Sequence, residues 1–237
     1  MTNAGLRIGI LETGRPPDTL RGFGSYPDMV ADWLAPLGGR FSSYAVLEND
    51  LPDSPGDADL WVITGSRFGV YEGHPWIAKL ERFVRRAQAA GSRMIGICFG
   101  HQLIAQALGG RVEKSDRGWG IGLHEYQPVN WPAPLAPAPE TLRIQAFHQD
   151  QVIEPPNAAR RIARSDFCEN AALWYPGFAF TVQGHPEFGA AYASRLLAAR
   201  RGSVLPPALV DRALEGIDAA STRRELALLL RDSVGSL

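Results

Sequence analysis

The feature that most constrains the fold of this chain is the segment Ser92 to Gly110, SRMIGICFGHQLIAQALGG, in which an apolar run leads through a cysteine into a helix-like pattern. Glycines stand two residues before and two residues after Cys98. A sharp turn from a strand into a helix forces its central residue into a sparsely populated backbone conformation, and small residues at these two positions relieve the crowding. The segment therefore predicts a strand, a nucleophile elbow at Cys98 and a helix.

Cys98 would also be well placed for chemistry. A helix N-terminus favours the thiolate form of a cysteine, and the free N–H of Phe99 would face a developing oxyanion. From this pentapeptide alone, a buried structural cysteine is an equal alternative. Cys168 has no such setting, and we predict that it is a small buried hydrophobic residue.

Short apolar runs recur along the chain and end at glycine, proline or serine, which is typical of strands buried on both faces. They are LRIGIL from Leu6, LWVIT from Leu60, RMIGI from Arg93, RIQAF from Arg143 and FAFTVQ from Phe178. Helical spacing of apolar residues marks YPDMVADWLAPL and HPWIAKLERFVRRAQAAG between the early runs. The alternation predicts an α/β fold with a doubly wound, mostly parallel sheet. After Gly110 the pattern changes, and we expect antiparallel additions to the sheet edge.

The domain organisation follows from the length of 237 residues and from the absence of an internal repeat. We expect a single domain over residues 1–237, with residues 203–237 as a C-terminal helical extension of one or two helices and a break at Gly216. The Pro-rich loop from Pro128 to Pro139 and the C-terminal helices are either a docking surface or a cover for the sheet.

The composition limits the partners. The formal net charge of −1 gives no reason to expect nucleic acid or a membrane as a partner, and a small neutral or zwitterionic ligand fits better. No apolar run approaches the ~20 residues that span a bilayer, and two cysteines do not make a disulfide framework. These features predict a cytoplasmic protein. We expect no metal site, because His74 and His124 have no partners at ligand spacing.

A second motif, TVQGHPEFG, supplies a candidate base for the thiolate. Pro186 biases His185 toward an extended conformation, and residues two apart in an extended chain point the same way. His185 and Glu187 should therefore share a face, where Glu187 could hold the imidazole in the tautomer that accepts a proton from Cys98. Taken alone, the triplet is more typical of a surface loop.

Together the two motifs resemble the class I glutamine amidotransferase family, which carries a G-x-C-x-G-x-Q elbow and a downstream His-Pro-Glu. Here the elbow runs from Gly96 to Gln102. The further segments GSRFGVYEGHPWI, GICFGHQLIAQALGG, GWGIG and QGHPEF are similar to the stand-alone branch of the family, which includes the γ-glutamyl peptidases. The resemblance covers most of the chain from Arg7 to about Arg200 and implies the flavodoxin-like class I glutamine amidotransferase fold.

The resemblance implies a Cys98, His185 and Glu187 triad that hydrolyses the γ-amide of glutamine, or a γ-glutamyl amide, through a thioester on the cysteine. Four further groups would meet the substrate. The N–H of Phe99 and a backbone N–H from Gly65 or Ser66 would bind the oxyanion, although Ser66 stands where the family commonly has a second glycine. Gln102 would bind the polar end of the substrate, and His148 would border the pocket, through its backbone or as a structural histidine.

The resemblance leaves three functions open, and it implies no cofactor. The first is a class I glutamine amidotransferase-like enzyme that hydrolyses glutamine, with a synthase subunit as a partner in trans. The alternative is a self-sufficient γ-glutamyl peptidase or hydrolase, and the third is a catalytically silent binding module. The intact Cys98, His185 and Glu187 argue against the third.

Overall fold

The computed structural model describes residues 5–236 of the chain. The strands are Arg7–Glu12 (β1), Arg40–Ala45 (β2), Leu60–Ile63 (β3), Arg93–Ile97 (β4), Arg111–Lys114 (β5), Gly120–Pro128 (β6), Leu142–His148 (β7), Asp150–Glu154 (β8), Arg160–Arg164 (β9), Ala172–Tyr175 (β10) and Ala179–Val182 (β11). The helices are Tyr26–Trp33 (α1), Pro75–Ala89 (α2), Phe99–Ala107 (α3), Ala190–Arg200 (α4), Pro207–Glu215 (α5) and Arg223–Ser233 (α6). Short 3₁₀ helices cover Asp18–Phe23 (η1), Ala35–Leu37 (η2), Val46–Glu48 (η3), Pro55–Asp57 (η4), Ala133–Leu135 (η5) and Val234–Ser236 (η6).

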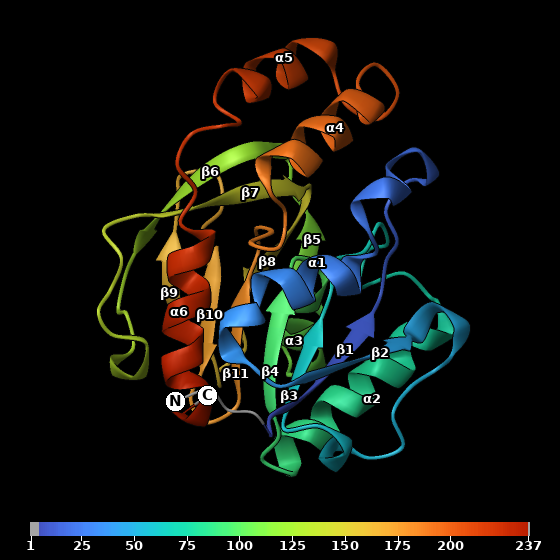
Figure 1. Ribbon diagram of the computed structural model, residues 1–237, viewed down its shortest axis with the longest axis vertical. Coiled ribbons are helices and arrows are strands. Elements are labelled where there is room, and N and C mark those ends of the chain that lie inside the picture. The colour runs from blue at the N-terminus through green and yellow to red at the C-terminus, as the bar shows by residue number, and fades with distance from the viewer. Residues whose placement is uncertain (1–4, 237) are drawn as a thin grey trace.

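Within residues 5–236, nine strands form one sheet in the order β2-β1-β3-β4-β11-β10-β9-β6-β7, and β5 pairs with β8 in a separate ribbon. The pairs from β2 to β11 are parallel, and those from β11 to β7 are antiparallel. The structure thus confirms the predicted α/β class with antiparallel additions (Figure 1). One detail differs, because β11 comes late in the sequence but joins the parallel half beside β4.

Each face of the sheet carries its own hydrophobic core. One core packs α1 and α6 against the strands, through side chains such as Val30 and Leu230. The other packs α2 and α3 against the opposite face, through side chains such as Phe83 and Leu103. The parallel strands are therefore buried on both sides, which is why their sequences are continuous apolar runs rather than alternating ones.

Local signals place the first two long helices. Ser25 caps α1, because its hydroxyl accepts a hydrogen bond from the N–H of Asp28 (3.2 Å) while the Asp28 carboxylate accepts one from the N–H of Ser25 (2.8 Å). α2 begins with Pro75, whose missing N–H costs nothing at a first helical position. Its apolar residues then recur on one face, which lies in the core.

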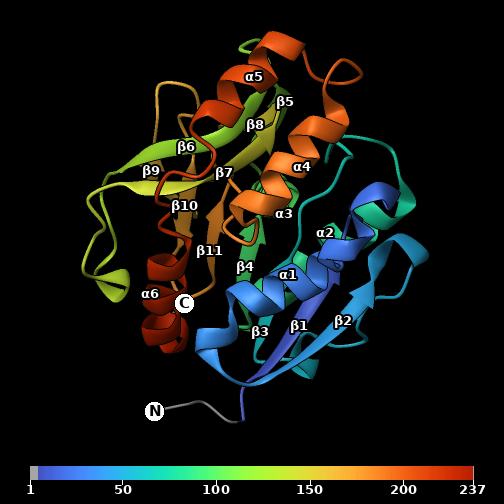
Figure 2. The same cartoon turned by 45° about the horizontal axis from the view of Figure 1, so that its top comes forward.

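The C-terminal segment forms α5 and α6, with Gly216 at the end of α5 as the sequence predicted. α6 lies over the sheet and also contacts the Pro-rich loop: Leu135 is fully buried in the same core, and the hydroxyl of Ser233 donates a hydrogen bond to the carbonyl of Pro134. α5 and α4 lie over the β6–β7 pair (Figure 2). Both the loop and α6 therefore help to cover the sheet.

None of the helices between residues 5 and 236 is long and apolar enough to span a bilayer.

The parallel half of the sheet fixes where a site can form. The loops that follow β1, β3, β4 and β11 leave the sheet at the carboxyl ends of parallel strands, and these ends lie at one edge. In open α/β sheets this edge is where ligands bind. Cys98 follows β4 directly, and His185 comes three residues after β11.

Candidate active site

Cys98 sits at a strained turn between β4 and α3. Its φ of 50° and ψ of −99° lie in a region that residues other than glycine rarely adopt. The flanking glycines make the turn possible: a methyl group at Gly96 would lie 2.7 Å from the carbonyl oxygen of Gly100, and one at Gly100 would collide with the carbonyl of Ile63. The side chain of Cys98 is mostly buried, at the start of α3.

His185 and Glu187 lie together, as the sequence predicted from their spacing. Nδ1 of His185 is 2.7 Å from Oε1 of Glu187, and both side chains are buried. The backbone N–H of His185 donates to the carbonyl of Gln145 in β7 (2.7 Å), which ties this loop to the neighbouring strand pair. The ring of Phe188 stacks on the imidazole at 4.1 Å, so the imidazole is held on one face and at one nitrogen.

The electrostatics of this group favour the protonated imidazole. Burial by itself lowers the pKa of His185, but the carboxylate of Glu187 and the sulfur of Cys98 outweigh burial and raise this pKa above its usual value. The site therefore favours a protonated imidazole close to the sulfur of Cys98.

Cys168 has the opposite environment. It is buried in the core on the face of α1 and α6, and burial raises its thiol pKa to about 12. Both cysteines are free thiols, so they form no disulfide with each other. Cys168 is thus the small buried residue that the sequence predicted.

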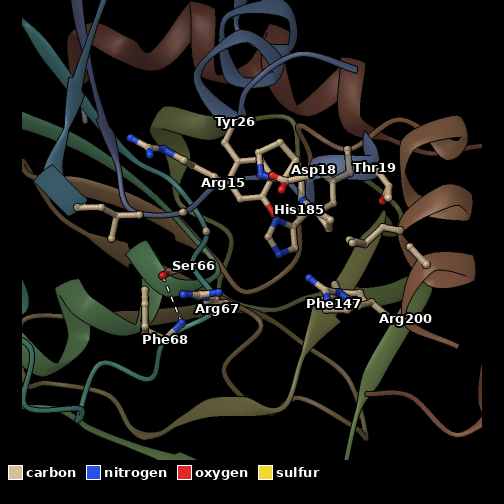
Figure 3. A pocket seen from close by; sticks show the side chains of 18 of the residues that line it. Arg15, Asp18, Thr19, Tyr26, Ser66, Arg67, Phe68, Phe147, His185 and Arg200 are labelled. Carbon is tan, nitrogen blue, oxygen red and sulfur yellow. Dashed lines mark hydrogen bonds between the residues drawn. The ribbon is translucent and has the colours of Figure 1, made fainter. Parts of the chain in front are cut away.

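The loop after β3 brings Gly65 against the imidazole. A methyl group at Gly65 would lie 2.6 Å from Cε1 of His185, so a side chain at this position would displace the ring. Ser66 is half-buried, and its hydroxyl accepts a hydrogen bond from the N–H of Phe68 at 3.3 Å (Figure 3). The geometry thus requires glycine at position 65 and accommodates a side chain at position 66. Phe99 is the first residue of α3, so its N–H has no acceptor within the helix.

A cavity of about 430 Å³ opens beside Cys98. Gln102 and His148, which the resemblance places at a substrate pocket, both line it. Nε2 of Gln102 donates to the carbonyl of Asp150 (2.9 Å) and to Oε1 of Gln183 (3.1 Å). Because Nε2 already donates two hydrogen bonds within the protein, Oε1 is the atom of this side chain that can contact a substrate. It can accept a hydrogen bond from an ammonium group.

His148 is neutral and fixed in one tautomer. Nδ1 lies 3.2 Å from the carbonyl of Asp150, so this nitrogen is the donor. Burial lowers the pKa of His148 to about 3. Nε2 is buried without a hydrogen-bond partner among the described residues, and Gly120 lies close beside it. The ring is thus a wall of the cavity, and it cannot serve as a proton donor at neutral pH.

A second and larger cavity, of about 810 Å³, lies on the side of His185 (Figure 3). Its walls come from the loops after β1 and β3 and from α4. The two cavities share Ser66, Arg67, Phe68, Phe147 and Arg200, and they meet at these residues. One cavity therefore adjoins the sulfur, and the other adjoins the imidazole.

Three arginines and one aromatic residue of this region were missed from the sequence. Arg67 and Arg200 line both cavities, although no sequence motif assigned them a role. Phe147 forms the apolar wall between them, and Arg223 donates from Nε to the carbonyl of Pro186 (2.8 Å). Arg67 belongs to the GSRFG segment, which could have suggested it. The other three come from distant segments, and no local pattern marks them.

Across residues 5–236, no group of three or more His, Cys, Asp or Glu side chains is arranged to hold a metal ion.

Comparisons with known proteins show which family this chain resembles. Residues 56–198 match the model of the family described as Glutamine amidotransferase class-I. γ-Glutamyl peptidase 4 of Arabidopsis thaliana is 31% identical to this chain over 178 residues, and the match covers 70% of this chain and 69% of the peptidase. GMP synthase (glutamine-hydrolyzing) of Aeropyrum pernix is 32% identical over 115 residues, which cover 48% of this chain and 22% of the synthase.

The fold also has solved counterparts. The crystal structure of a glutamine amidotransferase from Thermotoga maritima is similar to this chain with a TM-score of 0.75 and 23% sequence identity. The match covers 97% of this chain and 96% of that one. At this identity the likeness concerns the fold alone.

Proposed function

We propose, because this chain belongs to the class-I glutamine amidotransferase family, that it hydrolyses the γ-amide bond of γ-glutamyl compounds through a thioester on Cys98. His185 is the general base and acid of this reaction. Glu187 orients the imidazole and stabilises its positive charge. The whole chain acts as one catalytic domain, and its substrate is a small molecule. No cofactor takes part.

The reaction has two halves. The sulfur of Cys98 attacks the γ-carbonyl carbon, and the N–H groups of Phe99 and of the Gly65–Ser66 loop stabilise the resulting oxyanion. The C–N bond then breaks as His185 gives its proton to the leaving nitrogen. A water molecule, losing its proton to His185, attacks the thioester and releases glutamate and the free thiol.

One observation carries the proposal. The buried imidazole of His185 is hydrogen-bonded to the buried carboxylate of Glu187 at 2.7 Å, and it lies close to Cys98, whose backbone is held at a φ of 50°. A structural cysteine gains nothing from such strain, which costs about 1–3 kcal/mol. A nucleophile gains exposure of its sulfur toward a cavity and a position at a helix N-terminus. The catalytically silent module is disfavoured for the same reason.

The size of the second cavity favours a γ-glutamyl peptide over glutamine as the substrate. Ammonia needs no more room than a water molecule, whereas the space beside His185 measures about 810 Å³. His185 must protonate the leaving nitrogen, so the leaving group lies on this side of the site. Binding energy from a larger leaving group can then stabilise the transition state.

The test is glutamate release by the purified chain alone, measured for γ-glutamyl-glycine and for glutamine. We expect hydrolysis of the dipeptide, and we expect Cys98→Ala to reduce kcat by about a thousandfold or more. A glutamyl adduct on Cys98, found by mass spectrometry after rapid quenching, would support the thioester. Full activity in Cys98→Ala would refute the mechanism.

Glutamine hydrolysis for a synthase partner is the second candidate. The match to GMP synthase (glutamine-hydrolyzing) favours it, since that enzyme's name couples glutamine hydrolysis to a synthase. The two candidates differ in kcat/KM for glutamine and for the dipeptide with no partner present. A dipeptide preference above about tenfold, some 1.4 kcal/mol of transition-state discrimination, selects the peptidase. Equal or better use of glutamine selects the glutaminase.

A further inference from the structure

The junction of the two cavities carries positive charge only. Of the five residues that line both cavities, the charged ones are Arg67 and Arg200, and the others are neutral. Neither arginine forms an ion pair with any residue in the described part of the chain. Figure 3 shows their guanidinium groups below the His185 ring, that of Arg67 to the left and that of Arg200 to the right.

The other charged residues of the larger cavity are already paired. Arg15 contacts Glu48 at 2.6 Å, and Asp18 contacts Arg21 at 2.7 Å. Arg200 is half-buried at the end of α4, and Arg67 lies over the ring of its neighbour Phe68 at 4.9 Å. Two cations that face one cavity repel each other unless an anion joins them. The arrangement is therefore one that a bound anion would complete.

We propose that Arg67 and Arg200 bind the carboxylate of the leaving group, so that the preferred substrates are γ-glutamyl amino acids or peptides with a free carboxylate. This inference rests on the proposed function, because it requires the leaving amine to lie beside His185. A guanidinium matches a carboxylate through two parallel hydrogen bonds. An amino acid carries its carboxylate two bonds from the nitrogen that His185 protonates, which suits arginines at the junction next to that ring.

The anion could instead be the α-carboxylate of the glutamyl group, since both arginines also line the cavity beside Cys98. We favour the leaving group because His185 and both arginines line the larger cavity together. The two assignments differ in one substrate pair. The glycyl and glycinamide groups are nearly the same size, but only the glycyl group carries a carboxylate, so γ-glutamyl-glycine and γ-glutamyl-glycinamide differ mainly in the charge of this group.

The first measurement is binding, which does not depend on turnover. Calorimetry on the Cys98→Ala protein compares the Kd of γ-glutamyl-glycine with that of γ-glutamyl-glycinamide. We expect the carboxylate form to bind at least about tenfold more tightly. We expect Arg67→Gln and Arg200→Gln, each placed in the Cys98→Ala protein, to reduce this ratio toward one. Arg195→Gln is the matched control, because Arg195 is an exposed arginine of α4 that lines neither cavity.

The second measurement is kcat/KM for the same two substrates with active enzyme. The ratio should again favour γ-glutamyl-glycine by about tenfold or more, and it should fall in the Arg67 and Arg200 variants but not in Arg195→Gln. A binding preference without turnover would show a carboxylate site at the two arginines, but it would refute the proposed function and with it the assignment of that carboxylate to a leaving group. Turnover of both substrates at equal kcat/KM would support the proposed function and refute this inference.

Two further outcomes would overturn the proposal. If the arginine variants weaken both ligands by the same factor, the arginines bind the glutamyl carboxylate, which the two ligands share. If neither ligand binds to the Cys98→Ala protein, the junction is not a carboxylate site and the proposed function fails with it.

Discussion

At the scale of single residues, the two cysteines differ in backbone conformation and in surroundings. Cys98 is held at a left-handed φ at the start of α3, against His185. Cys168 lies in a hydrophobic core, where burial raises its pKa to about 12. The thiolate is the reactive form of cysteine, so a thiol with a raised pKa is inert near neutral pH.

We predict that mild iodoacetamide treatment labels Cys98 before Cys168. The reason is the imidazole beside Cys98 and the apolar core around Cys168. Peptide mass spectrometry over a time course checks the order, with the Cys98→Ala protein as the control for Cys168. Preferential labelling of Cys168 in the native protein would contradict the assignment.

We predict that His185→Ala lowers kcat more than Glu187→Gln does, and that the latter costs roughly 10²- to 10⁴-fold. In the proposed mechanism the imidazole moves the proton, whereas the carboxylate at 2.7 Å orients the ring and stabilises its charge. Steady-state kinetics with γ-glutamyl-glycine checks the order. An unchanged kcat in His185→Ala would show that this ring is not the base.

Glu187→Gln should also change how stability depends on pH. The pKa of His185 is raised in the folded protein. The stabilisation from its pairing with Glu187 is therefore complete at pH values below the His185 pKa of the unfolded chain, about 6.5, and it is lost as the pH rises through the raised pKa of the folded protein. The Tm difference between wild type and Glu187→Gln should therefore be largest near pH 6 and smaller near pH 9. Thermal melts followed by circular dichroism test this, and a difference that grows with pH would contradict it.

At the scale of elements, the start of α6 supports the loop that carries His185 and Glu187. Arg223 donates from Nε to the carbonyl of Pro186 (2.8 Å) and from Nη2 to that of Glu187 (3.3 Å). Its own carbonyl accepts a hydrogen bond from the indole of Trp33 in α1 (2.9 Å). A helix near the end of the chain thus fixes backbone atoms next to the imidazole, although it touches no reacting group.

We predict that Arg223→Ala lowers kcat by about tenfold with little change in KM. The reason is that the His185 ring is no longer held in one orientation, while the substrate cavities stay intact. Arg223→Lys should recover part of the loss, since an ammonium can still donate to one carbonyl. Arg224→Ala is the matched control, because its side chain is exposed and adjacent in sequence. A fall in Tm with unchanged kcat would show that Arg223 acts on stability alone.

At the scale of the whole molecule, the sheet needs a cover on both faces. α6 supplies part of one cover, with Leu226 and Leu230 buried among residues of α1 and of the Pro-rich loop. The helices in residues 203–237 therefore contribute buried side chains to the hydrophobic cores. The larger of the two cavities also depends on long-range packing, because α4 closes it over loops from the N-terminal half.

We predict that Leu230→Ala lowers the free energy of unfolding by about 2–5 kcal/mol, because the side chain is fully buried. Leu229→Ala should cost less, since Leu229 is only half-buried one position away on the same helix. Urea denaturation of both variants checks the difference. Equal losses would show that α6 packs differently from the arrangement described.

The sequence by itself determined what local physics controls. The elbow around Cys98 was predictable because its two glycines mark a crowded turn, and the extended backbone before Pro186 placed His185 and Glu187 on one face. The strands β1, β3 and β4 were predictable because a strand buried on both faces leaves a continuous apolar run. In each case the residues that interact, or the pattern that reveals them, lie within a few positions of each other.

Tertiary structure alone decided which distant segments meet. β11 lies beside β4, which brings His185 to the sulfur of Cys98, and no local pattern specifies the strand order. Arg200 and Arg223 are typical arginines of amphipathic helices, yet Arg200 lines the cavities beside Cys98 and His185, and Arg223 holds the loop of His185. Helical periodicity tells which side of a helix is polar, but what lies opposite that side depends on how the whole chain packs.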